Sequence, residues 1–488
     1  MKQQILLYNT LTKRKEPFHP SRTGSTEGLY PKVGMYVCGP TVYGDPHLGH
    51  ARSAITFDIL YRILRHQGIV VTYVRNITDV GHLTDSGEDK IELKAKGIGL
   101  DPLTISRYCT NKYHICMNRL SCYPPTIEPK ASEHIQEQIE VIQEILNSGY
   151  AYIKDGSVYF DTIKYASNHK YGKLSGRVIE DSLEITRDLQ GTSDKKNQAD
   201  FALWKKSKPG DLQKWLSPWS EGCPGWHIEC TAMSRKYLGK TYNIHGGGLD
   251  LVFPHHECEI AQSIASTGRE PCSFWVHNNM ITIDGKKMGK SLGNFITLEQ
   301  FFTGNHPILS KAYSPMTIRF FILQAHYRSP LDFSDQALQA AERGLKTLME
   351  MIQETNEKIV LEQPDSVMDK ITKVNEDCMS FLYDDMATPQ VLSSLFSLRE
   401  IITGPLNKRE KIELQSLFST IVGDLLGLSQ ETSFETKPFE EAVNYIIDLR
   451  KKARDNKDWE TSDKIRDFLE NSGFEIKDTN SSTKWKLK

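Results

Sequence analysis

The sequence predicts an α/β fold: a Rossmann-like parallel-sheet domain with an insertion, followed by a helical bundle and a small C-terminal α+β domain. Three observations support this prediction. A strand–helix–strand pattern occupies residues 33–76, and a second α/β stretch runs from about 222 to 300. From 335 to 430 the chain carries long Leu, Ile and Met patterns with few glycines, which is typical of a bundle.

The first half of the expected sheet lies at 33–76. The apolar run KVGMYVCG predicts a strand, ARSAITFDILYRILRHQ has the apolar spacing of a helix, and IVVTYVRN is β-branched like a second strand. Two strands joined in this way form a parallel pair with a right-handed crossover. The turn PTVYGDPHLGH then lies at the carboxyl edge of the sheet, where open α/β folds bind ligands.

The second half of the sheet domain follows a more polar stretch. GWHIECTAMSRKYLG and PHHECEIAQSIASTG have helical character, and they are followed by the strands TYNIHGGG and FWVHNNMITI respectively. The segment between the two halves is rich in Tyr, Asp, Lys and Gly, so we expect it to be an insertion.

The tail differs from the bundle that precedes it. It combines two short helical patterns with the alternating runs FEIKD and TKWKLK, which predict a two-stranded sheet. The expected segments are therefore the two halves of the catalytic sheet domain at 1–127 and 222–305, the insertion at 128–221, a connector at 306–345, the bundle at 346–430 and the tail at 431–488.

Composition excludes several classes of protein. The nine cysteines are scattered over 488 residues, which argues against a disulfide framework. No stretch approaches the roughly 20 apolar residues that span a bilayer, and the first residues lack a secretory signal. We therefore expect a cytoplasmic protein without membrane contact. Because the net charge is −2, any basic surface for nucleic acid must be local.

Two short motifs carry groups that suit phosphate. In HLGH, His47 and His50 stand beside the positive end of the helix dipole, and Gly49 permits close approach of a ligand. In KKMGKSLGN, Lys287 and Lys290 can follow charge that develops on a triphosphate. Taken singly, each motif is also typical of an ordinary turn or a solvated loop.

Together, and in this order, the two motifs resemble the signatures of the class I aminoacyl-tRNA synthetases, which activate an amino acid with ATP on a Rossmann-like sheet. The resemblance implies that His47, Gly49, His50 and Lys290 bind ATP. It also implies that His47, His50 and Lys290 stabilise the reacting α-phosphate, with Lys287 helping.

Two positions depart from the family pattern. Leu48 stands where the family usually has Ile, and Gly289 stands where it usually has Ser. The first change conserves volume. The second should make the loop more mobile, although it removes neither lysine.

A candidate metal site is scattered over the sheet domain. Cys38 ends the first expected strand, Cys230 lies in GWHIEC, and His255 and Glu259 share one helix face because they are four residues apart. Two thiols, an imidazole and a carboxylate are suitable zinc ligands.

The residues alone leave other ligand sets open. Spacing does not distinguish His255 from His256 as the partner of Glu259. A cysteine in an apolar strand is also an ordinary core residue. Further candidates stand close by in the sequence: His227, Cys223 and Cys258.

Longer motifs resemble the cysteinyl-tRNA synthetase family. They are MYVCGPTVY, PGWHIEC, HGGGLDLVFPHHE and KSLGNF, and the similarity continues through PPTIEP, DFALWK, HYRSPLDFS, DDMATP and KDW to the terminal TKWKLK. It thus covers nearly the whole chain. The resemblance implies an enzyme that forms cysteinyl-adenylate from L-cysteine and ATP and transfers the cysteine to the 3′ end of tRNA-Cys.

The resemblance also chooses among the ligands. It places one zinc ion per chain on Cys38, Cys230, His255 and Glu259, and Mg²⁺ accompanies ATP. Zinc with an open position can bind a thiolate, for which a serine hydroxyl is a poor substitute. We further expect a monomer.

The remaining candidates contact substrate or RNA. Trp226 is expected to wall the amino-acid pocket, with Thr78 and His245 as contacts to the amino acid or adenylate. By the resemblance, 306–345 contacts the tRNA stem and the tail reads the anticodon. Single-stranded bases suit stacking and edge hydrogen bonds, and the candidate anticodon contacts are Arg454, Asp463, Asp478 and Trp485.

Two rival functions fit part of the sequence. A cysteine ligase of the mycothiol type shares the zinc site but joins cysteine to an amino sugar, and it lacks an anticodon-reading tail. A degenerate relative that only binds RNA would not need both phosphate motifs and all four metal ligands. Cysteine-dependent exchange of pyrophosphate into ATP separates an enzyme from such a binder.

Overall fold

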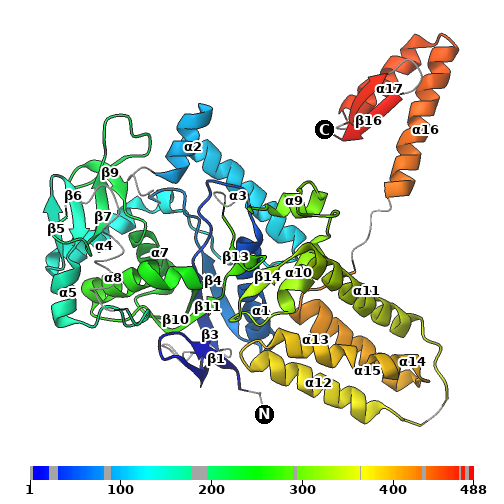
Figure 1. Ribbon diagram of the computed structural model, residues 1–488, viewed down its shortest axis with the longest axis horizontal. Helices are drawn as coiled ribbons and strands as arrows, with labels where there is room; N and C mark the ends of the chain where they lie inside the picture. The colour runs from blue at the N-terminus through cyan, green and yellow to red at the C-terminus, as the bar shows by residue number, and fades with distance from the viewer. Residues whose placement is uncertain are drawn as a thin grey trace. The chain divides into compact units, whose positions relative to one another are not determined.

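The computed structural model describes residues 4–20, 31–81, 89–177, 195–289, 294–362, 364–430, 436–471, 474–478 and 483–487. They belong to two compact units, Met1–Ser429 and Gln430–Lys488. The first unit contains the sheet, the inserted segment and the bundle, and the second contains the tail (Figure 1). The finer six-part division stays a prediction.

A four-stranded parallel sheet forms the centre of the first unit (Figure 1). Its strand order is β11-β10-β3-β4. The bounds are β3 (Lys32–Val37), β4 (Val70–Arg75), β10 (Tyr242–Gly248) and β11 (Cys272–Asn278). Helix α1 (Leu48–His66) connects β3 to β4, and α8 (Glu257–Thr267) connects β10 to β11. The connections run outward from the central β3–β10 pair, which creates the switch point at which such sheets bind ligands. The predicted α/β fold class is confirmed.

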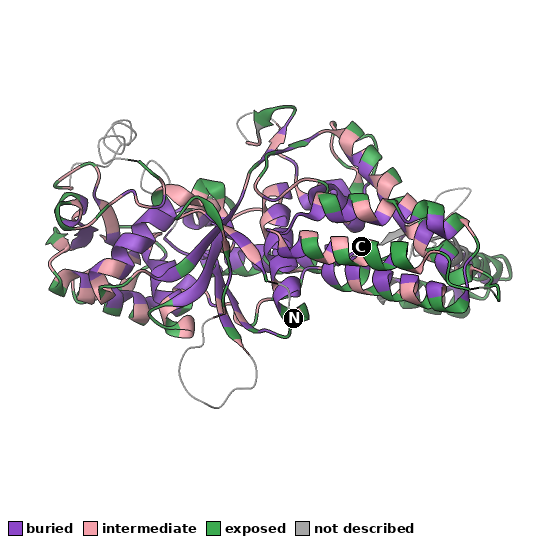
Figure 2. Ribbon diagram, turned by 90° about the horizontal axis from the view of Figure 1, so that it is seen from below, coloured by how far each residue is buried: buried purple, intermediate pink, exposed green. Residues whose placement is uncertain are grey.

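Alternate residues of β3 enter different layers. Val33, Met35 and Val37 pack in the large core that contains α1. Tyr36 faces the other side, where Met233 of α7 (Ile228–Leu238) and residues of α8 cover the sheet. This period of two buries both faces, and in Figure 2 the strands of the sheet are coloured as buried.

A hairpin and two helices flank the sheet. The hairpin consists of β1 (Leu6–Asn9) and β2 (Arg14–Pro17), and it packs against β11. The two helices are α2 (Lys90–Ile98) and α3 (Pro102–Arg119). Asp101 caps α3, and proline occupies its first position, where the missing N–H costs nothing.

The inserted segment has a sheet of its own, which the sequence did not reveal. This sheet is antiparallel, with order β5-β6-β7-β9-β8. Its elements are α4 (Ile135–Asn147), β5 (Ala151–Lys154), β6 (Ser157–Phe160), α5 (Thr162–Asn168), β7 (Phe201–Lys206), β8 (Trp215–Leu216) and β9 (Glu221–Pro224). Helix α4 packs against α7 and α8, so the insertion rests on the layer that supplies the site.

A second small sheet follows the parallel one, with order β13-β12-β14. Its elements and the helices beside it are β12 (Ile281–Ile283), β13 (Lys286–Lys287), α9 (Leu298–Thr303), α10 (Pro315–Leu323) and β14 (Leu331–Phe333). The segment beginning at Lys286 was expected to be a loop, but it starts with the short strand β13. The reason is the turn at Asp284 and Gly285, whose φ angles are 49° and 72°, because this conformation closes tight hairpins.

The predicted bundle is present. It comprises α11 (Asp335–Glu357), α12 (Met368–Tyr383), α13 (Thr388–Phe396), α14 (Arg399–Thr403), α15 (Lys408–Leu417) and a wider helical turn at Phe418–Leu425. Its helices bury one side and expose the other (Figure 2), as amphipathic helices do.

Two buried arginines, both paired with Asp58, tie the end of the bundle to α1 and α10. Asp58 accepts hydrogen bonds from Arg62 at 2.7 Å and from Arg319 of α10 at 2.5 Å. The two guanidinium groups also bind backbone carbonyls at the end of the bundle, those of Asp424 and Leu426, each at 2.7 Å. The paired charges and filled donors make this an acceptable buried network.

The second unit has the α+β form predicted for the tail. Its elements are α16 (Thr436–Asp455), α17 (Trp459–Asn471), β15 (Phe474–Asp478) and β16 (Thr483–Leu487), and the two strands are antiparallel. Trp459 is 57% exposed. Trp485 is instead half-buried, because Ile476 pairs with it and its ring packs on Phe474 at 5.7 Å.

Candidate functional site

A cavity of about 420 Å³ opens at the carboxyl edge of the parallel sheet. Its lining includes residues that follow β3, the first turn of α1, and Thr78 beyond the end of β4. Gly248 and Asn278 line it from the ends of β10 and β11. Strands on both sides of the switch point therefore reach the cavity, as expected for a ligand site in this fold.

The HLGH motif forms one wall of this cavity and the start of α1. The Nδ1 atom of His47 accepts a hydrogen bond from the Gly49 backbone N–H at 3.1 Å, and that of His50 accepts from the His47 N–H at 3.2 Å. In a neutral imidazole the other ring nitrogen then carries the proton. Both rings thus have Nε2–H as a donor. Burial lowers the pKa of His50 to about 4, so this ring is neutral near pH 7.

Gly49 has a packing role in the motif. A Cβ atom at this position would lie 2.9 Å from the His47 ring. Any larger residue would therefore displace the ring that caps the helix. The spacing of the motif is thus set by the helix start itself.

The second motif reaches the cavity through Met288, which lines it. The Gly289 backbone N–H donates to the Asn294 side chain at 2.9 Å. Lys290 lies outside the described residues, and of Lys287 only the backbone, in β13, is described. The roles of both lysines stay predictions.

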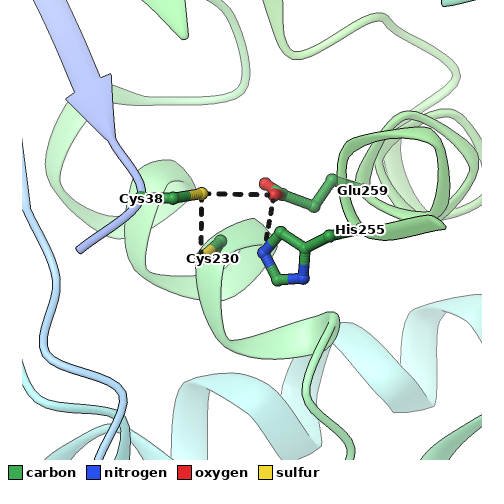
Figure 3. A group of neighbouring side chains, drawn as sticks. All are labelled: Cys38, Cys230, His255 and Glu259. Atoms are coloured by element: carbon green, nitrogen blue, oxygen red, sulfur yellow. Dashed lines mark hydrogen bonds and ion pairs between the residues drawn. The ribbon is translucent and has the colours of Figure 1, made fainter. Parts of the chain in front are cut away.

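The four residues expected as metal ligands lie together (Figure 3). Their ligand atoms all lie within 4.8 Å of one another. The Cys38 Sγ is 3.7 Å from the Cys230 Sγ and 3.7 Å from the Glu259 carboxylate, while the His255 Nε2 is 3.2 Å from that carboxylate. The sulfur separation is far beyond the roughly 2.05 Å of a disulfide.

Three parts of the fold bring these ligands together. Cys38 directly follows β3, and Cys230 is in the first turn of α7. Glu259 is near the start of α8, and His255 is in the irregular turn Val252–His256 that precedes it. The cluster therefore exists only when the two halves of the sheet domain are assembled.

The electrostatics of the cluster disfavour charge on its members. Burial raises the pKa of Cys38 to about 12 and raises those of Cys230 and Glu259 well above their usual values. Burial lowers the pKa of His255 to about 3. A bound cation would reverse the first three shifts, since metal ligands bind in deprotonated form. The soft donor atoms, their close spacing and the burial of acidic groups without an opposite charge all fit a bound metal ion.

Comparisons with known proteins agree with this geometry. Residues 26–343 match the family model described as tRNA synthetases class I (C) catalytic domain. The chain is 53% identical to the Cysteine–tRNA ligase of Phocaeicola vulgatus and 54% identical to that of Parabacteroides distasonis, covering 100% of both chains in each case. The chain belongs to the cysteine–tRNA ligase family. It is therefore an aminoacyl-tRNA ligase of class I.

Two solved structures of low sequence identity have a similar fold. A Mycobacterium tuberculosis methionyl-tRNA synthetase in complex with methionyl-adenylate aligns with a TM-score of 0.54 over 81% of this chain and 92% of its own, at 12% identity. An Agrobacterium radiobacter LeuRS in a ternary complex aligns with a TM-score of 0.58 over 84% of this chain and 86% of its own, at 10% identity.

Among the described residues, no helix is both long and apolar enough to cross a membrane.

Two more histidines border the cluster of this family member. Cys38, His245, His256 and Glu259 form a second group with the same close spacing. The His256 Nε2 is 3.2 Å from the Cys38 Sγ, and its Nδ1 is bonded to His277 at 2.8 Å. The Nδ1 of His245 is bonded to the Tyr242 hydroxyl at 2.6 Å. Geometry thus keeps both His255 and His256 near Glu259.

Of the three expected substrate contacts, two line the cavity and one does not. Trp226 and Thr78 line the cavity, and the Trp226 ring lies 4.6 Å from that of His255. His245 is fully buried beside Cys38 and is not among the lining residues. Its role as a substrate contact stays a prediction.

The three further ligand candidates, His227, Cys223 and Cys258, lie outside both groups within the described part of the chain. Cys223 is in β9 of the inserted sheet. The Cys258 Sγ is 3.7 Å from the Tyr171 hydroxyl. His227 bonds through Nδ1 to the Nδ1 of His255 at 2.9 Å, so it supports a ligand candidate from outside the group.

Two polar residues at the site were missed in the sequence. Asn76 lines the cavity, and its side chain accepts from the Gly39 backbone N–H at 2.8 Å. Glu229 is 1% exposed and accepts from the Thr78 hydroxyl at 2.7 Å. The available signal was position: Asn76 follows the end of a strand, and Glu229 precedes a candidate ligand.

The candidate anticodon residues lie in the second unit. Arg454 and Asp463 are exposed on α16 and α17. Trp485 donates through its indole N–H to the Asn444 side chain at 2.9 Å. Asp478 ends β15, and its side chain lies outside the described residues. Their contacts with RNA stay predictions.

Proposed function

We propose that this protein forms cysteinyl-adenylate from L-cysteine and ATP and transfers cysteine to the 3′ end of tRNA-Cys. The observation that carries the proposal is one shared cavity. The HLGH turn lines it, and so do Cys38, Cys230 and His255 of the metal-ligand cluster. A group that binds sulfur and a group that binds phosphate thus face the same space, as adenylate formation requires.

The proposed resident metal is one zinc ion per chain, held by Cys38, Cys230, His255 and Glu259. Two thiolates, an imidazole and a carboxylate suit zinc. When bound, zinc supplies a coordination position that accepts a thiolate and disfavours a hydroxyl. Pocket contacts alone separate near-identical amino acids poorly, so the ligand set supports selection of cysteine over serine.

The proposed phosphate site consists of His47 and His50 at the positive end of α1. Their Nε2–H groups can donate to phosphate oxygens, and Gly49 leaves the first turn open to a ligand. Lys287 and Lys290 are proposed to stabilise charge on the triphosphate. Mg²⁺ is proposed to accompany ATP, because it prefers phosphate oxygens.

The second unit is proposed to read the anticodon of tRNA-Cys through Arg454, Asp463, Asp478 and Trp485. Exposed Trp459 adds an aromatic surface of the kind that single-stranded bases use. We further propose that the protein acts as a monomer in the cytoplasm.

The test is cysteine-dependent exchange of pyrophosphate into ATP, followed by charging of tRNA-Cys. We expect exchange with cysteine, none with serine, and cysteine esterified to tRNA-Cys. Exchange without charging, combined with ligation of cysteine to an amino sugar, would contradict the proposal and favour the mycothiol-type activity. Absence of exchange would contradict enzymatic activation altogether.

A further inference from the structure

Arg52 is a buried arginine near the start of α1, two residues beyond His50. Its side chain is 1% exposed and does not line the cavity. The buried Arg62 and Arg319 balance their charge with Asp58. Among the described residues, Arg52 instead donates only to backbone carbonyls, and no carboxylate pairs with it. Since burying a charge is costly, this arrangement requires a reason other than an ion pair.

The carbonyls that Arg52 binds belong to two separate segments. Its Nη1 donates to the Met280 carbonyl at 3.2 Å. Its Nη2 donates to carbonyls of the loop that precedes β14, those of His326 at 3.2 Å, Tyr327 at 3.3 Å and Ser329. The Asn279 backbone N–H joins the same two segments, because it donates to the Tyr327 carbonyl at 2.8 Å. A guanidinium group is a rigid planar fork of donors, so Arg52 fixes both segments relative to α1.

Met280 stands at the entrance to the segment that carries the second motif. It lines the cavity and directly precedes β12, which is followed by β13 with the first lysines of that motif. The far end of this segment is also joined to the HLGH turn, because the Leu298 N–H donates to the Pro46 carbonyl at 2.8 Å. Arg52 and Pro46 thus hold the two ends of the segment 280–298 against the same helix start.

We propose that Arg52 is a positioning residue for amino-acid activation, which fixes the start of the second-motif segment against the phosphate-facing turn. This role rests on the proposed function and adds to it a residue that contacts neither cysteine nor ATP. Arg52 acts through β12, whose start it holds at a set distance from His47 and His50. A misplacement of about 1 Å can cost about 100-fold in rate. Loss of Arg52 should therefore reduce the rate of activation more than the affinity for cysteine.

Two variants of the full-length protein test this role. Arg52→Gln removes the charge and most of the donors. Arg52→Lys keeps the charge, but an ammonium group lacks the fork that spans both segments. In cysteine-dependent pyrophosphate exchange, we expect kcat to fall by about 100-fold in Arg52→Gln and about 10-fold in Arg52→Lys. The KM for cysteine should change by less than about twofold. Zinc content and the calorimetric stoichiometry of cysteine binding count the folded sites, so that kcat is compared per folded site.

A double-mutant cycle separates positioning from a general weakening of the fold. Lys290→Ala removes the second-motif lysine that is proposed to stabilise the triphosphate. If Arg52 acts through this motif, Arg52→Gln should slow the Lys290→Ala protein by less than about threefold. A general weakening would slow both backgrounds equally. Lys358→Gln is the matched control, because this ammonium group also donates to a backbone carbonyl, that of Ile402 in the bundle, at 2.7 Å. It should leave kcat unchanged.

The outcomes distinguish the role of Arg52 from the function on which it rests. A wild-type kcat per folded site in both variants, or additive losses in the cycle, would overturn the proposal and leave Arg52 a structural residue. If Arg52→Gln does not fold, Arg52→Lys takes its place in the cycle with the same criterion. A wild-type protein that shows no cysteine-dependent exchange would instead count against the proposed function.

Discussion

Two buried glutamates of the first unit have opposite surroundings. Glu410 in the bundle is fully buried and accepts backbone N–H bonds from Ser366, Val367 and Asn407 at 2.5, 2.8 and 2.9 Å. Burial alone would raise its pKa, but these bonds lower it below the usual value. Glu259 is 2% exposed, and burial raises its pKa well above the usual value.

The difference separates a structural acid from a ligand. Glu410 completes the start of α15 and has its charge satisfied by the protein. Glu259 faces Cys38 and His255, which cannot balance a negative charge unless the imidazole is protonated. A buried carboxylate that lacks backbone donors and has soft neighbours therefore indicates a cation site.

The largest expected effect is loss of the cluster. Cys230→Ser and His255→Ala should each lower zinc content from about one per chain and reduce cysteine-dependent exchange. The reduction should exceed the roughly 10- to 100-fold that loss of an outer partner of a metal ligand costs. Metal analysis and exchange assays measure both quantities. Cys378→Ser, a buried cysteine of the bundle, is the control. Full zinc retention in both site variants would show that the cluster is not the metal site.

A somewhat smaller effect is expected at the phosphate site. His50→Asn removes the Nε2–H donor and should slow adenylate formation by about 100- to 1,000-fold, with zinc retained. Single-turnover measurement of the adenylate checks this. The control is His66→Asn, at the exposed far end of the same helix. A wild-type rate in His50→Asn would remove this residue from the mechanism.

A substitution at Glu410 in the bundle should change the stability of the protein and not its catalytic activity. Glu410→Gln leaves backbone donors less well matched and should lower the free energy of unfolding by about 1–3 kcal/mol. Urea denaturation measures this, and pyrophosphate exchange should be unchanged below the transition. Glu400→Gln, an exposed residue of α14, should unfold like the wild type. If fully folded Glu410→Gln lost zinc or activity, the assignment of a structural role to Glu410 and a ligand role to Glu259 would be wrong.

The smallest expected effect is the pH dependence of the difference in stability between wild type and Glu410→Gln. The pKa of Glu410 is lower in the folded than in the unfolded chain. The stabilising contribution of the Glu410 carboxylate is therefore fully present above its pKa in the unfolded chain, about 4.3. This contribution is lost as the pH falls through its lower pKa in the folded chain. The difference in free energy of unfolding between wild type and Glu410→Gln should be constant from about pH 6 to 8, because Glu410 is ionised in both the folded and the unfolded chain there. The difference should become smaller at about pH 3. A gap that widened on acidification would contradict this assignment.

Local patterns predicted much of the fold. Apolar alternation and helical spacing identified β3, α1 and β4, and they also identified the two helices and two strands of the tail. The DG turn at 284–285 was a readable hairpin signal that was overlooked. The pairing of Met35 with Ile244 joins distant segments, and no periodicity reports such a contact. The inserted sheet was missed for the same reason.

The site was only partly accessible to sequence reasoning. Residue types and motif resemblance selected Cys38, Cys230, His255 and Glu259, and the fold brings them together. Ring orientation depends on tertiary partners such as the bond between His256 and His277, which spacing cannot reveal. Glu229 escaped notice because its unmatched oxygen becomes apparent only when burial is known.

Helix α1 gives the molecule a mechanical property. Its 19 residues make a rod of about 28 Å at roughly 1.5 Å per residue. One end carries the HLGH turn. Further along the rod, Asp58 accepts from Arg319 of α10, and Arg62 donates to the Asp424 backbone carbonyl of the bundle. Removing one partner of a buried ion pair costs about 3–5 kcal/mol. Because one helix carries both the phosphate-facing turn and this anchor, the position of the turn is tied to the packing at the end of the bundle.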